Sequence, residues 1–267
     1  MSRPFPAASR PRRDARPEPG PPGWILGRLL YRDALVLVID KPAGLPVHAG
    51  PKGGPNLEDH LDALRFGLPR RPGLAHRLDR DTSGCLVLGR HRQALARLGR
   101  LFASGQVEKV YWAVVQGLPP EPEGRVEAPL RKRNELRGWW METHPEGQPA
   151  VTDYRVLGRA EDRDLTWLEC RPRTGRTHQV RVHAAVLGCP VLGDPVYGAE
   201  GEPRPPLHLH ARAVTLPLYP GKPPIAVEAP PPEHMLDALR ACGWAADHVE
   251  ASPPVALHGP RRATGPR

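Results

Sequence analysis

The sequence predicts an α+β fold with a mixed, mostly antiparallel central sheet, flanked by helices and loops around a cleft. Apolar runs typical of strands alternate irregularly with amphipathic segments typical of helices. Because a parallel sheet needs regular strand–helix–strand units, this irregular order favours antiparallel pairing. Hydrophobic residues make up 39% of the 267 residues and charged residues 25%, a balance that lets a globular chain bury a substantial core.

Short runs of apolar, β-branched and aromatic residues predict the strands. The runs cover residues 35–39, 85–88, 110–115, 152–157, 165–170 and 207–216. The first run ends at residues 40–44, Asp-Lys-Pro-Ala-Gly, because Pro and Gly stop a strand. Residues 117–150 are rich in Gly, Pro and basic side chains, and strand-like runs resume only at residue 152.

Apolar residues at helical spacing predict helices at 56–64, 94–102, 177–187 and 233–241. In the first of these, Leu57, Leu61 and Leu64 share a face and Asn56 is a suitable N-cap. The second helix carries its arginines away from its apolar face.

The two ends of the chain predict disordered tails at 1–23 and 251–267, which leaves residues 24–250 as the folded body. Both tails are poor in apolar side chains and so cannot repay the entropy of ordering. Each tail carries a net charge of +3, so only +3 of the total of +9 belongs to the body. A case for a polyanionic partner therefore depends on how arginines cluster within the body.

Arginines gather in three parts of the body, and several lie next to Trp or Tyr. The clusters are Arg70, Arg71, Arg77 and Arg80; Arg131, Lys132 and Arg133; and Arg171, Arg173, Arg176 and Arg181. Cations suit phosphates and flat side chains suit unpaired bases, so the pattern favours single-stranded or looped RNA as a partner. Ordinary surface charge explains these clusters equally well.

The four cysteines are scattered without a C-x-x-C pair, which argues against a zinc ribbon or a disulfide framework. We expect buried thiols in a reducing compartment and therefore a cytoplasmic protein. No apolar run reaches the roughly 18 residues that a membrane span needs, so we expect no membrane partner.

The segment from His76 to Gly84 holds two carboxylates, Asp79 and Asp81, among arginines. Arginine neighbours keep a carboxylate ionised, as a nucleophile or a base requires. Asp81 begins the turn sequence Asp-Thr-Ser-Gly and is expected to accept hydrogen bonds from backbone N–H groups. Asp79 is therefore the chemical candidate, although its local sequence alone favours a structural role.

Two other kinds of site have weaker support. His208 and His210 are two apart on a predicted strand and suggest a metal site, but no carboxylate is placed to complete it. The Gly-rich segment 50–55 lacks the order of a phosphate-binding loop, and no dinucleotide fingerprint occurs. We therefore expect chemistry without a metal, a nucleotide or another cofactor.

Five segments, in order along the chain, resemble motifs of the RluA-type RNA pseudouridine synthases. They are Asp-Lys-Pro-Ala-Gly at 40–44, His-Arg-Leu-Asp-Arg-Asp-Thr-Ser-Gly at 76–84, Lys-Val-Tyr-Trp-Ala at 109–113, Arg-Thr-Gly-Arg-Thr-His-Gln-Val-Arg-Val-His at 173–183 and Gly-Asp-Pro-Val-Tyr-Gly at 193–198. Each motif is weak alone, but their shared order makes the resemblance specific. It covers about residues 31–228 and implies the pseudouridine synthase fold, with 24–250 as the catalytic domain.

The resemblance implies a role for each matching residue. Asp79 is implied to be the catalytic carboxylate, Tyr111 to pack on the target uracil and help with proton transfer, and Arg181 to pair with Asp79. Arg77 is implied to take part in flipping the base. The remaining motif residues that we expect to bind the substrate are His76, Arg176, Thr177 and His178.

The resemblance also implies an isomerase that converts specific uridines of ribosomal or transfer RNA to pseudouridine, as a monomer and without a cofactor. Many relatives carry an S4-type RNA-binding domain before the catalytic body, for which 23 residues are too few. RNA selection is therefore expected to depend on the body, its Trp139-Trp140 region and the tails. Two alternatives stay open: an RNA-binding module of the same fold without catalysis, and a metal-dependent hydrolase that uses His208 and His210.

Overall fold

The structure is a computed structural model that describes residues 23–50, 53–133, 140–198 and 204–245. The two predicted tails, apart from Gly23, lie outside the described residues, as does Trp139. Within these ranges, no helix is long and apolar enough to cross a bilayer.

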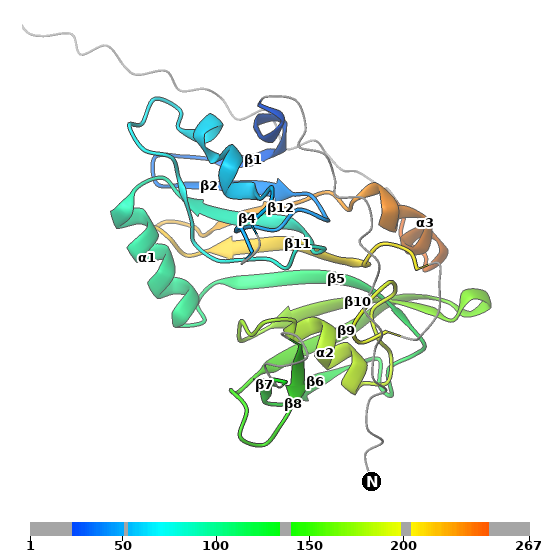
Figure 1. Ribbon diagram of the computed structural model, residues 1–267. Helices are drawn as coiled ribbons and strands as arrows, with labels where there is room; N and C mark the ends of the chain where they lie inside the picture. The colour runs from blue at the N-terminus through cyan, green and yellow to red at the C-terminus, as the bar shows by residue number, and fades with distance from the viewer. Residues whose placement is uncertain (1–22, 51–52, 134–139, 199–203, 246–267) are drawn as a thin grey trace, which may run out of the picture.

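A ten-stranded sheet runs through the molecule in the order β1-β2-β4-β11-β5-β10-β9-β6, with β3 paired to β4 and β12 to β11 (Figure 1). The strands are β1 (Leu29–Arg32), β2 (Val36–Lys41), β3 (Gly73–Leu74), β4 (Ser83–Gly89), β5 (Glu108–Gln116), β6 (Glu123–Glu127), β9 (Val151–Ala160), β10 (Leu165–Pro172), β11 (Leu209–Leu216) and β12 (Ile225–Glu228). Across the described part of this sheet, every strand pair is antiparallel except β4 with β11. The prediction of an α+β fold with a mostly antiparallel sheet is confirmed.

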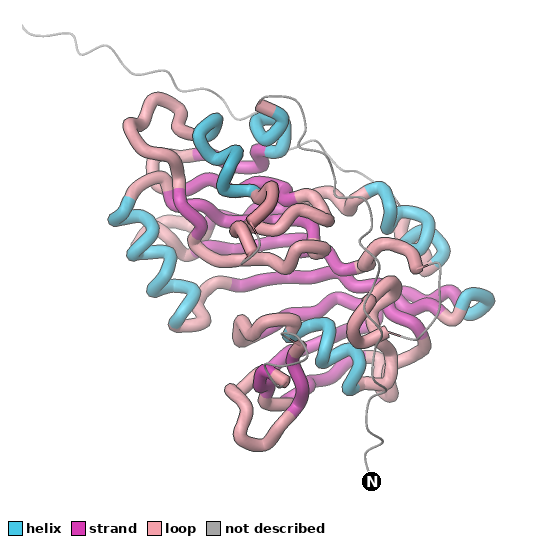
Figure 2. Tube along the Cα trace, in the orientation of Figure 1, coloured by secondary structure: helices cyan, strands magenta, loops and turns pink. Residues whose placement is uncertain are grey.

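Helices cover both faces of the sheet, as Figure 2 shows. The helical segments are α1 (Arg92–Ala103), α2 (Gln179–Val186) and α3 (Glu233–Ala241), together with the 3₁₀ segments η1 (Trp24–Arg28), η2 (Leu57–Leu64) and η4 (Glu161–Arg163). A separate hairpin of β7 (Leu130–Lys132) and β8 (Met141–Thr143) lies against α2.

Alternating side chains of the strands fill a core on each face. In the half of the sheet that contains β2 and β4, Leu37 packs with η2 on one face, and Val38 packs with α1 on the other. In the half that contains β5 and β10, Leu168 packs with α2, and Trp167 packs with α3. Tyr111 on β5 contacts both the η2 core and the α2 core. The side chain of Tyr111 therefore lies where the two halves meet on one face.

Two predicted helices differ in detail from the structure. Residues 57–64 form a 3₁₀ helix, and Asn56 caps it as expected by accepting a hydrogen bond from the N–H group of Glu58 at 3.0 Å. The helix predicted from residue 177 begins at Gln179, because His178 has a φ of 54°. That left-handed conformation cannot be part of a right-handed helix.

Strands β1, β3, β6, β7, β8 and β12 were not predicted, because few of their side chains are buried. Within β6 only Val126 is buried, and within β7 only Leu130. A strand with so little apolar surface has no alternating pattern to detect. Pairing with neighbouring strands, rather than local sequence, defines these elements.

Gly84 allows β4 and β11 to approach each other at their one parallel contact. Its φ is 104°, and a Cβ atom there would lie 2.3 Å from the carbonyl oxygen of Ala211. No residue with a side chain fits such a position without a shift of the backbone. Because β4 follows the segment that carries Asp79, this contact fixes where that segment lies.

Candidate active site

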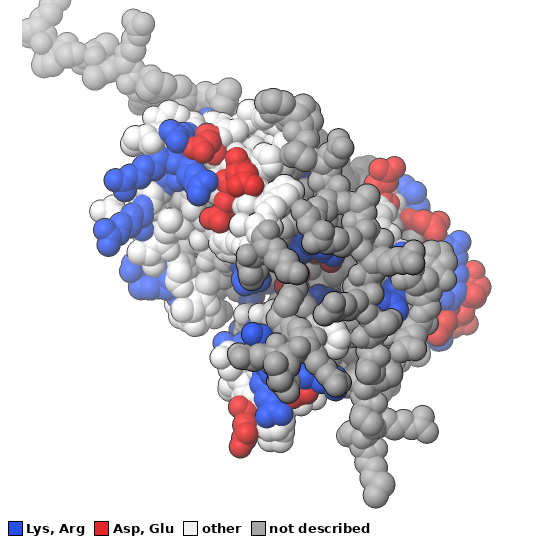
Figure 3. Space-filling model, viewed as in Figure 1, with Lys and Arg blue, Asp and Glu red and all other residues white. Residues whose placement is uncertain are grey.

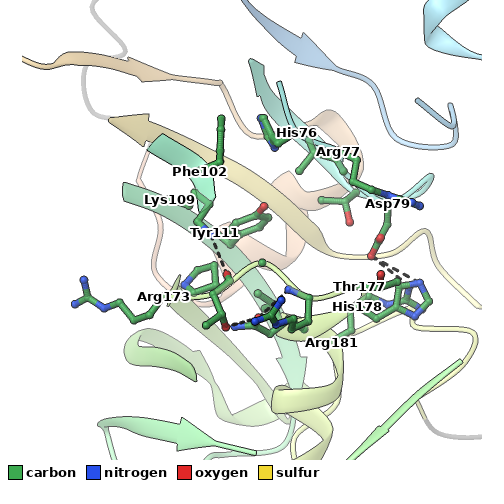
Figure 4. A pocket seen from close by; sticks show the side chains of 18 of the residues that line it. His76, Arg77, Asp79, Phe102, Lys109, Tyr111, Arg173, Thr177, His178 and Arg181 are labelled. Atoms are coloured by element: carbon green, nitrogen blue, oxygen red, sulfur yellow. Dashed lines mark hydrogen bonds and ion pairs between the residues drawn. The ribbon is translucent and has the colours of Figure 1, made fainter. Parts of the chain in front are cut away.

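A cleft of about 590 Å³ opens where the two halves of the sheet meet (Figure 4). The segment before β4 lines it on one side, β5 contributes Tyr111 between the two sides, and the loop before α2 lines it on the other. All the site residues that the sequence predicted line this cleft: His76, Arg77, Asp79, Tyr111, Arg176, Thr177, His178 and Arg181. Segments that are far apart in the sequence are thus brought together.

Asp79 presents its carboxylate to two nitrogen atoms across the cleft. Its Oδ2 atom lies 3.7 Å from Nη1 of Arg181 and 3.8 Å from Nε2 of His178. The Asp79 side chain is 20% exposed, whereas those of Arg181 and His178 are 5% and 2% exposed. The carboxylate is therefore accessible from the cleft, while the groups behind it are fixed in the protein.

The loop that carries Asp79 is held from behind by Lys41. This buried side chain donates hydrogen bonds from Nζ to the carbonyl oxygens of Pro42, Leu45 and Arg80 at 2.7, 2.8 and 2.9 Å. Burial lowers the pKa of Lys41 to about 7, while its three acceptors match the three N–H bonds of an ammonium group. Lys41 thereby joins the segment after β2 to the residue that follows Asp79.

The predicted hydrogen-bond partners of Asp81 are wrong. Its carboxylate accepts hydrogen bonds from Nε and Nη2 of Arg80 at 2.9 and 3.0 Å, rather than from backbone N–H groups. The turn is instead closed by a backbone bond, in which the N–H group of Thr82 donates to the carbonyl oxygen of Asp79 at 3.2 Å. The exposed position of Arg80 makes this ion pair a surface contact.

Arg181 makes its hydrogen bonds to Asp194, a partner that the sequence did not indicate. Nε and Nη2 donate to the two carboxylate oxygens of Asp194 at 2.7 and 2.8 Å. Burial raises the pKa of Asp194, but the bonds from Arg181 and from the N–H groups of Val196 and Tyr197 outweigh burial and hold this pKa below its usual value. The contact of Arg181 with Asp79 is thus longer than the one implied by the resemblance, and Asp194 fixes the guanidinium.

A hydrogen-bond chain determines which nitrogen of His178 faces Asp79. The hydroxyl of Tyr197 accepts the N–H of Met141 at 3.0 Å and lies 2.9 Å from Nδ1 of His178. The hydroxyl can give its own hydrogen to Nδ1, an arrangement in which the neutral ring carries its hydrogen on Nε2, toward Asp79. Burial, and then the charge of Arg181, lower the pKa of His178 to about 4, so the ring is neutral near pH 7.

Tyr111 lies on β5 between Asp79 and Lys109, as Figure 4 shows. Burial, and then the negative charge of Asp79, raise the pKa of its phenol above the usual value. The phenol therefore keeps its proton at neutral pH. It offers a flat face for a base, and a hydroxyl that can donate or accept a hydrogen bond.

His76 and Lys109 form the wall of the cleft nearest α1. The N–H of Val87 donates to Nε2 of His76 at 3.0 Å, and the imidazole stacks on Phe102 with 4.5 Å between ring centres. Burial, and then the charge of Lys109, lower the pKa of His76 to about 4. Burial also lowers the pKa of Lys109 to about 8, and its Nζ donates to the carbonyl of Thr174 at 2.9 Å. His76 is thus a fixed, neutral ring.

Gln179 fixes the loop that carries Arg176 and Thr177. Its Oε1 accepts hydrogen bonds from the hydroxyl of Thr174 at 2.7 Å and the N–H of Arg176 at 3.0 Å. Its Nε2 donates to the carbonyl of Val151 at 2.9 Å. The loop before α2 is therefore tied to the start of β9, although Gln179 itself was predicted only as part of a motif.

The histidines of the proposed metal site do not form a ligand set. Nδ1 of His210 lies 2.8 Å from the hydroxyl of Ser83, and its Nε2 lies 3.2 Å from the carbonyl of Ala229. Nδ1 of His208 bonds the carbonyl of Pro206 at 2.7 Å. Among the described residues, no group of three His, Cys, Asp or Glu side chains is arranged to hold a metal ion.

Sequence reasoning assigned no role to Asp194, Tyr197, Lys109 or Phe102, which the structure places in or behind the cleft. The signal for the first three was their position in matching motifs. Phe102 was expected only as a core residue of a helix.

The comparisons with known proteins identify the family of the chain. A family model described as RNA pseudouridylate synthase matches residues 35–186. An uncharacterized RNA pseudouridine synthase of Zymomonas mobilis is 44% identical over 213 residues, which are 79% of this chain and 96% of the relative. The ribosomal large subunit pseudouridine synthase D of Xanthomonas campestris is 45% identical over 177 residues, which are 64% of this chain but only 51% of the relative.

A solved structure supports the same assignment. The chain has a TM-score of 0.68 and 29% identity with human RNA pseudouridylate synthase domain containing 4, over 82% of this chain and 94% of that one. Fold and sequence together define an enzyme of the isomerase class that modifies RNA. The chain belongs to the RNA pseudouridylate synthase family.

Proposed function

We propose that this enzyme isomerises specific uridines of ribosomal or transfer RNA to pseudouridine, with Asp79 as its catalytic carboxylate. One observation carries the proposal: the partly exposed carboxylate of Asp79 faces Arg181 and shares a cleft with Tyr111. The name of the Xanthomonas relative, a ribosomal large subunit enzyme, supports ribosomal RNA as the first substrate to test. We further propose that the enzyme acts as a monomer in the cytoplasm.

The reaction breaks the N1–C1′ bond of uridine, turns the uracil and joins C5 to C1′, while the hydrogen on C5 is released as a proton and N1 takes up a proton in its place. The atoms of the nucleoside therefore balance, and the isomerisation consumes no co-reactant. Asp79 acts either as a nucleophile at C1′ or as a base toward a sugar proton. Both routes need an ionised carboxylate, and the guanidinium of Arg181 lies 3.7 Å from Oδ2 of Asp79.

The target base has to leave its stack before it reaches Asp79. Tyr111 supplies a flat face on which the uracil packs, and its protonated hydroxyl is suited to exchange a proton with the base. Arg77 is exposed at the cleft and is suited to occupy the space that the base vacates. Thr177, Arg176 and His178 line the opposite side and contact the flipped nucleotide in this proposal.

Asp79→Asn tests the catalytic assignment. It removes the charge without changing the size of the side chain, so we expect turnover to fall by about 10³-fold or more. Release of tritium from RNA labelled at uridine C5 measures the reaction, with ribosomal and transfer RNA transcripts as separate substrates. Asp81→Asn is the matched control in the same loop, and it should keep activity close to that of the wild type because Asp81 pairs with exposed Arg80.

The same pair of variants distinguishes the proposed enzyme from the main alternative. An RNA-binding module without catalysis would release no tritium in any form, while it would still bind the RNA. If Asp79→Asn modified RNA as fast as the wild type, the assignment of Asp79 would be wrong.

A further inference from the structure

The structure divides the arginines into those that are paired with carboxylates and those that are not. On the half of the molecule formed by β5–β10, eight of the exposed arginines that the structure describes lie within 4.0 Å of an Asp or Glu, whereas Arg204 and Arg240 do not. These pairs are Arg125 and Arg173 with Asp153, Arg131 and Arg133 with Glu142, Arg155 and Arg171 with Glu169, Arg159 with Glu161, and Arg163 with Asp237. An adjacent opposite charge weakens the field that an arginine projects into solvent, also where two arginines share one carboxylate.

Helix α1 is different. Its arginines are Arg92, Arg97 and Arg100, which we call the α1 face, and the helix contains no acidic residue. Among the residues that the structure describes, none of these three guanidinium groups lies within 4.0 Å of a carboxylate. Figure 3 shows Lys and Arg gathered over α1, where blue and red do not alternate as they do at the opposite edge of the molecule.

Two further arginines extend the α1 face. Arg70 and Arg71 are exposed just before β3, and β3 packs directly on α1. A Cβ atom on Gly73 would lie 2.8 Å from the side chain of Leu95, which shows how closely the two segments approach. The segment before β3 therefore adds the charge of Arg70 near α1, while Arg71 donates a hydrogen bond to the carbonyl oxygen of Glu58 on η2 at 2.8 Å.

The α1 face is continuous with the catalytic cleft. A shallow hollow lined by Arg97 and Arg100 also includes Ala103 and Ser104, and these two residues belong to the wall of the cleft. Arg97 and Arg100 are three apart and so share one side of the helix. From Arg97 to Ser104 the helix rises about 10 Å, so the unpaired charges begin close to the cleft.

We propose that the α1 face binds the phosphate backbone of the RNA that flanks the target uridine. The inference deepens the proposed function, on which it rests, by naming the surface that holds the strand outside the cleft. RNA is the occupant that fits, because it is polyanionic and already enters the adjoining cleft. The basic β7–β8 hairpin and the loop before α2, which the sequence favoured, carry arginines that are paired with Glu142, Glu169 and Asp153, so part of their charge is offset.

Binding of a short RNA stem-loop to full-length variants tests the surface. Arg97→Gln with Arg100→Gln removes two charges from the α1 face, and Arg131→Gln with Arg133→Gln removes two from the rival hairpin. We expect the first double variant to weaken the Kd about tenfold or more at 0.1 M salt. The slope of log K against log[salt] should fall by about 1.4 to 1.8, which corresponds to two lost phosphate contacts. The hairpin variant should change Kd by less than about threefold.

A third double variant controls for net charge. Arg159→Gln with Arg163→Gln removes two paired arginines near the β9–β10 turn, at the far end of the sheet from α1 (Figure 1). It should bind RNA with the affinity and salt slope of the wild type. Thermal unfolding of all three variants establishes that they fold. The arginines of α1 do not contact the reacting groups. In the α1 variant, KM should therefore rise with Kd while kcat is retained.

Wild-type affinity and salt slope in the α1 variant would overturn the proposal, and so would a larger loss in the hairpin variant. Equal losses in all three would show only the effect of net charge and would also overturn it. If the α1 face bound an acidic protein instead of RNA, its variant would keep the wild-type Kd and salt slope for the stem-loop. That result would also overturn the proposal. If the wild-type chain bound the stem-loop without isomerising it, the proposed function would be contradicted. The comparison of Kd values among the variants would still show whether the α1 face binds RNA.

Discussion

At the scale of single residues, the Oδ2 atom of Asp79 faces two nitrogen atoms whose positions other residues determine. Asp194 holds the guanidinium of Arg181 with two hydrogen bonds, and Tyr197 orients the imidazole of His178. A buried charge is stable only with a partner, so the buried Arg181 needs Asp194 whatever it does for Asp79. The motif at 193–198 thus supports the site from behind rather than lining it.

Tyr197→Phe tests whether Tyr197 acts by positioning the imidazole of His178. Without the hydroxyl, Nδ1 of His178 loses its donor and both neutral tautomers become populated. We expect kcat to fall about tenfold, equivalent to about 1.4 kcal/mol, with KM for RNA unchanged. Nitrogen NMR of labelled His178 should show a mixture of tautomers in the variant and the Nε2–H form in the wild type.

Tyr219→Phe is the control for that prediction. It removes a hydroxyl that donates to Asp33 at 2.9 Å, away from the cleft, and should leave kcat and the His178 spectrum unchanged. If Tyr197→Phe kept both full turnover and a single tautomer, the hydrogen-bond chain would have no role in orienting His178.

At the scale of elements, the sequence predicted the buried strands and helices and missed the exposed ones. Strand β2 is buried along its whole length and was evident as an apolar run, whereas β6 buries only Val126. The start of α2 was misplaced because the left-handed backbone of His178 depends on tertiary contacts rather than on local propensity. Periodicity reports burial, so an element without a buried face leaves no pattern.

Gly84→Ala tests how the contact between β4 and β11 supports the site. The added Cβ would meet the carbonyl of Ala211, at a φ that disfavours side chains. We expect the free energy of unfolding to fall by about 2 kcal/mol or more, together with a loss of turnover as the Asp79 loop moves. Urea unfolding and the tritium-release assay measure the two effects.

Gly99→Ala on α1 is the matched control, and we expect it to raise the free energy of unfolding rather than lower it. Nothing lies within 4 Å of a Cβ at this helical position. Alanine should therefore raise stability by about 0.5 to 1 kcal/mol and leave activity unchanged. A Gly84→Ala protein as stable as the wild type would mean that the strands tolerate a wider separation.

At the scale of the whole molecule, several buried histidines are neutral parts of the structure. Burial lowers the pKa values of His76, His178 and His210 to about 4, and it also lowers those of His183 and His208. The unfolded chain titrates near pH 6.5, so between about pH 6.5 and 4 it binds protons that the folded chain excludes. The stabilisation from these neutral rings is present above about pH 6.5 and is lost as the pH falls.

Urea unfolding at a series of pH values measures this dependence. We expect the free energy of unfolding contributed by these histidines to be level above about pH 7 and to fall progressively toward pH 4. His210→Gln, which is distant from the reacting groups, removes one titrating ring and should reduce the steepness of that fall. An unchanged pH profile in this variant would show that the pKa of His210 is the same in the folded and the unfolded protein.

The sequence by itself determined the fold class, the family and the identities of eight residues that line the cleft, because motifs and apolar patterns are local properties of the chain. Only the tertiary structure decided which partner each charge has. Asp194 bonds Arg181, and Glu142 pairs with Arg131 and Arg133 of the β7–β8 hairpin, whereas the arginines of α1 pair with no carboxylate of the described residues. Charge pairing depends on distances between segments remote in sequence, and burial sets how strongly each pair interacts.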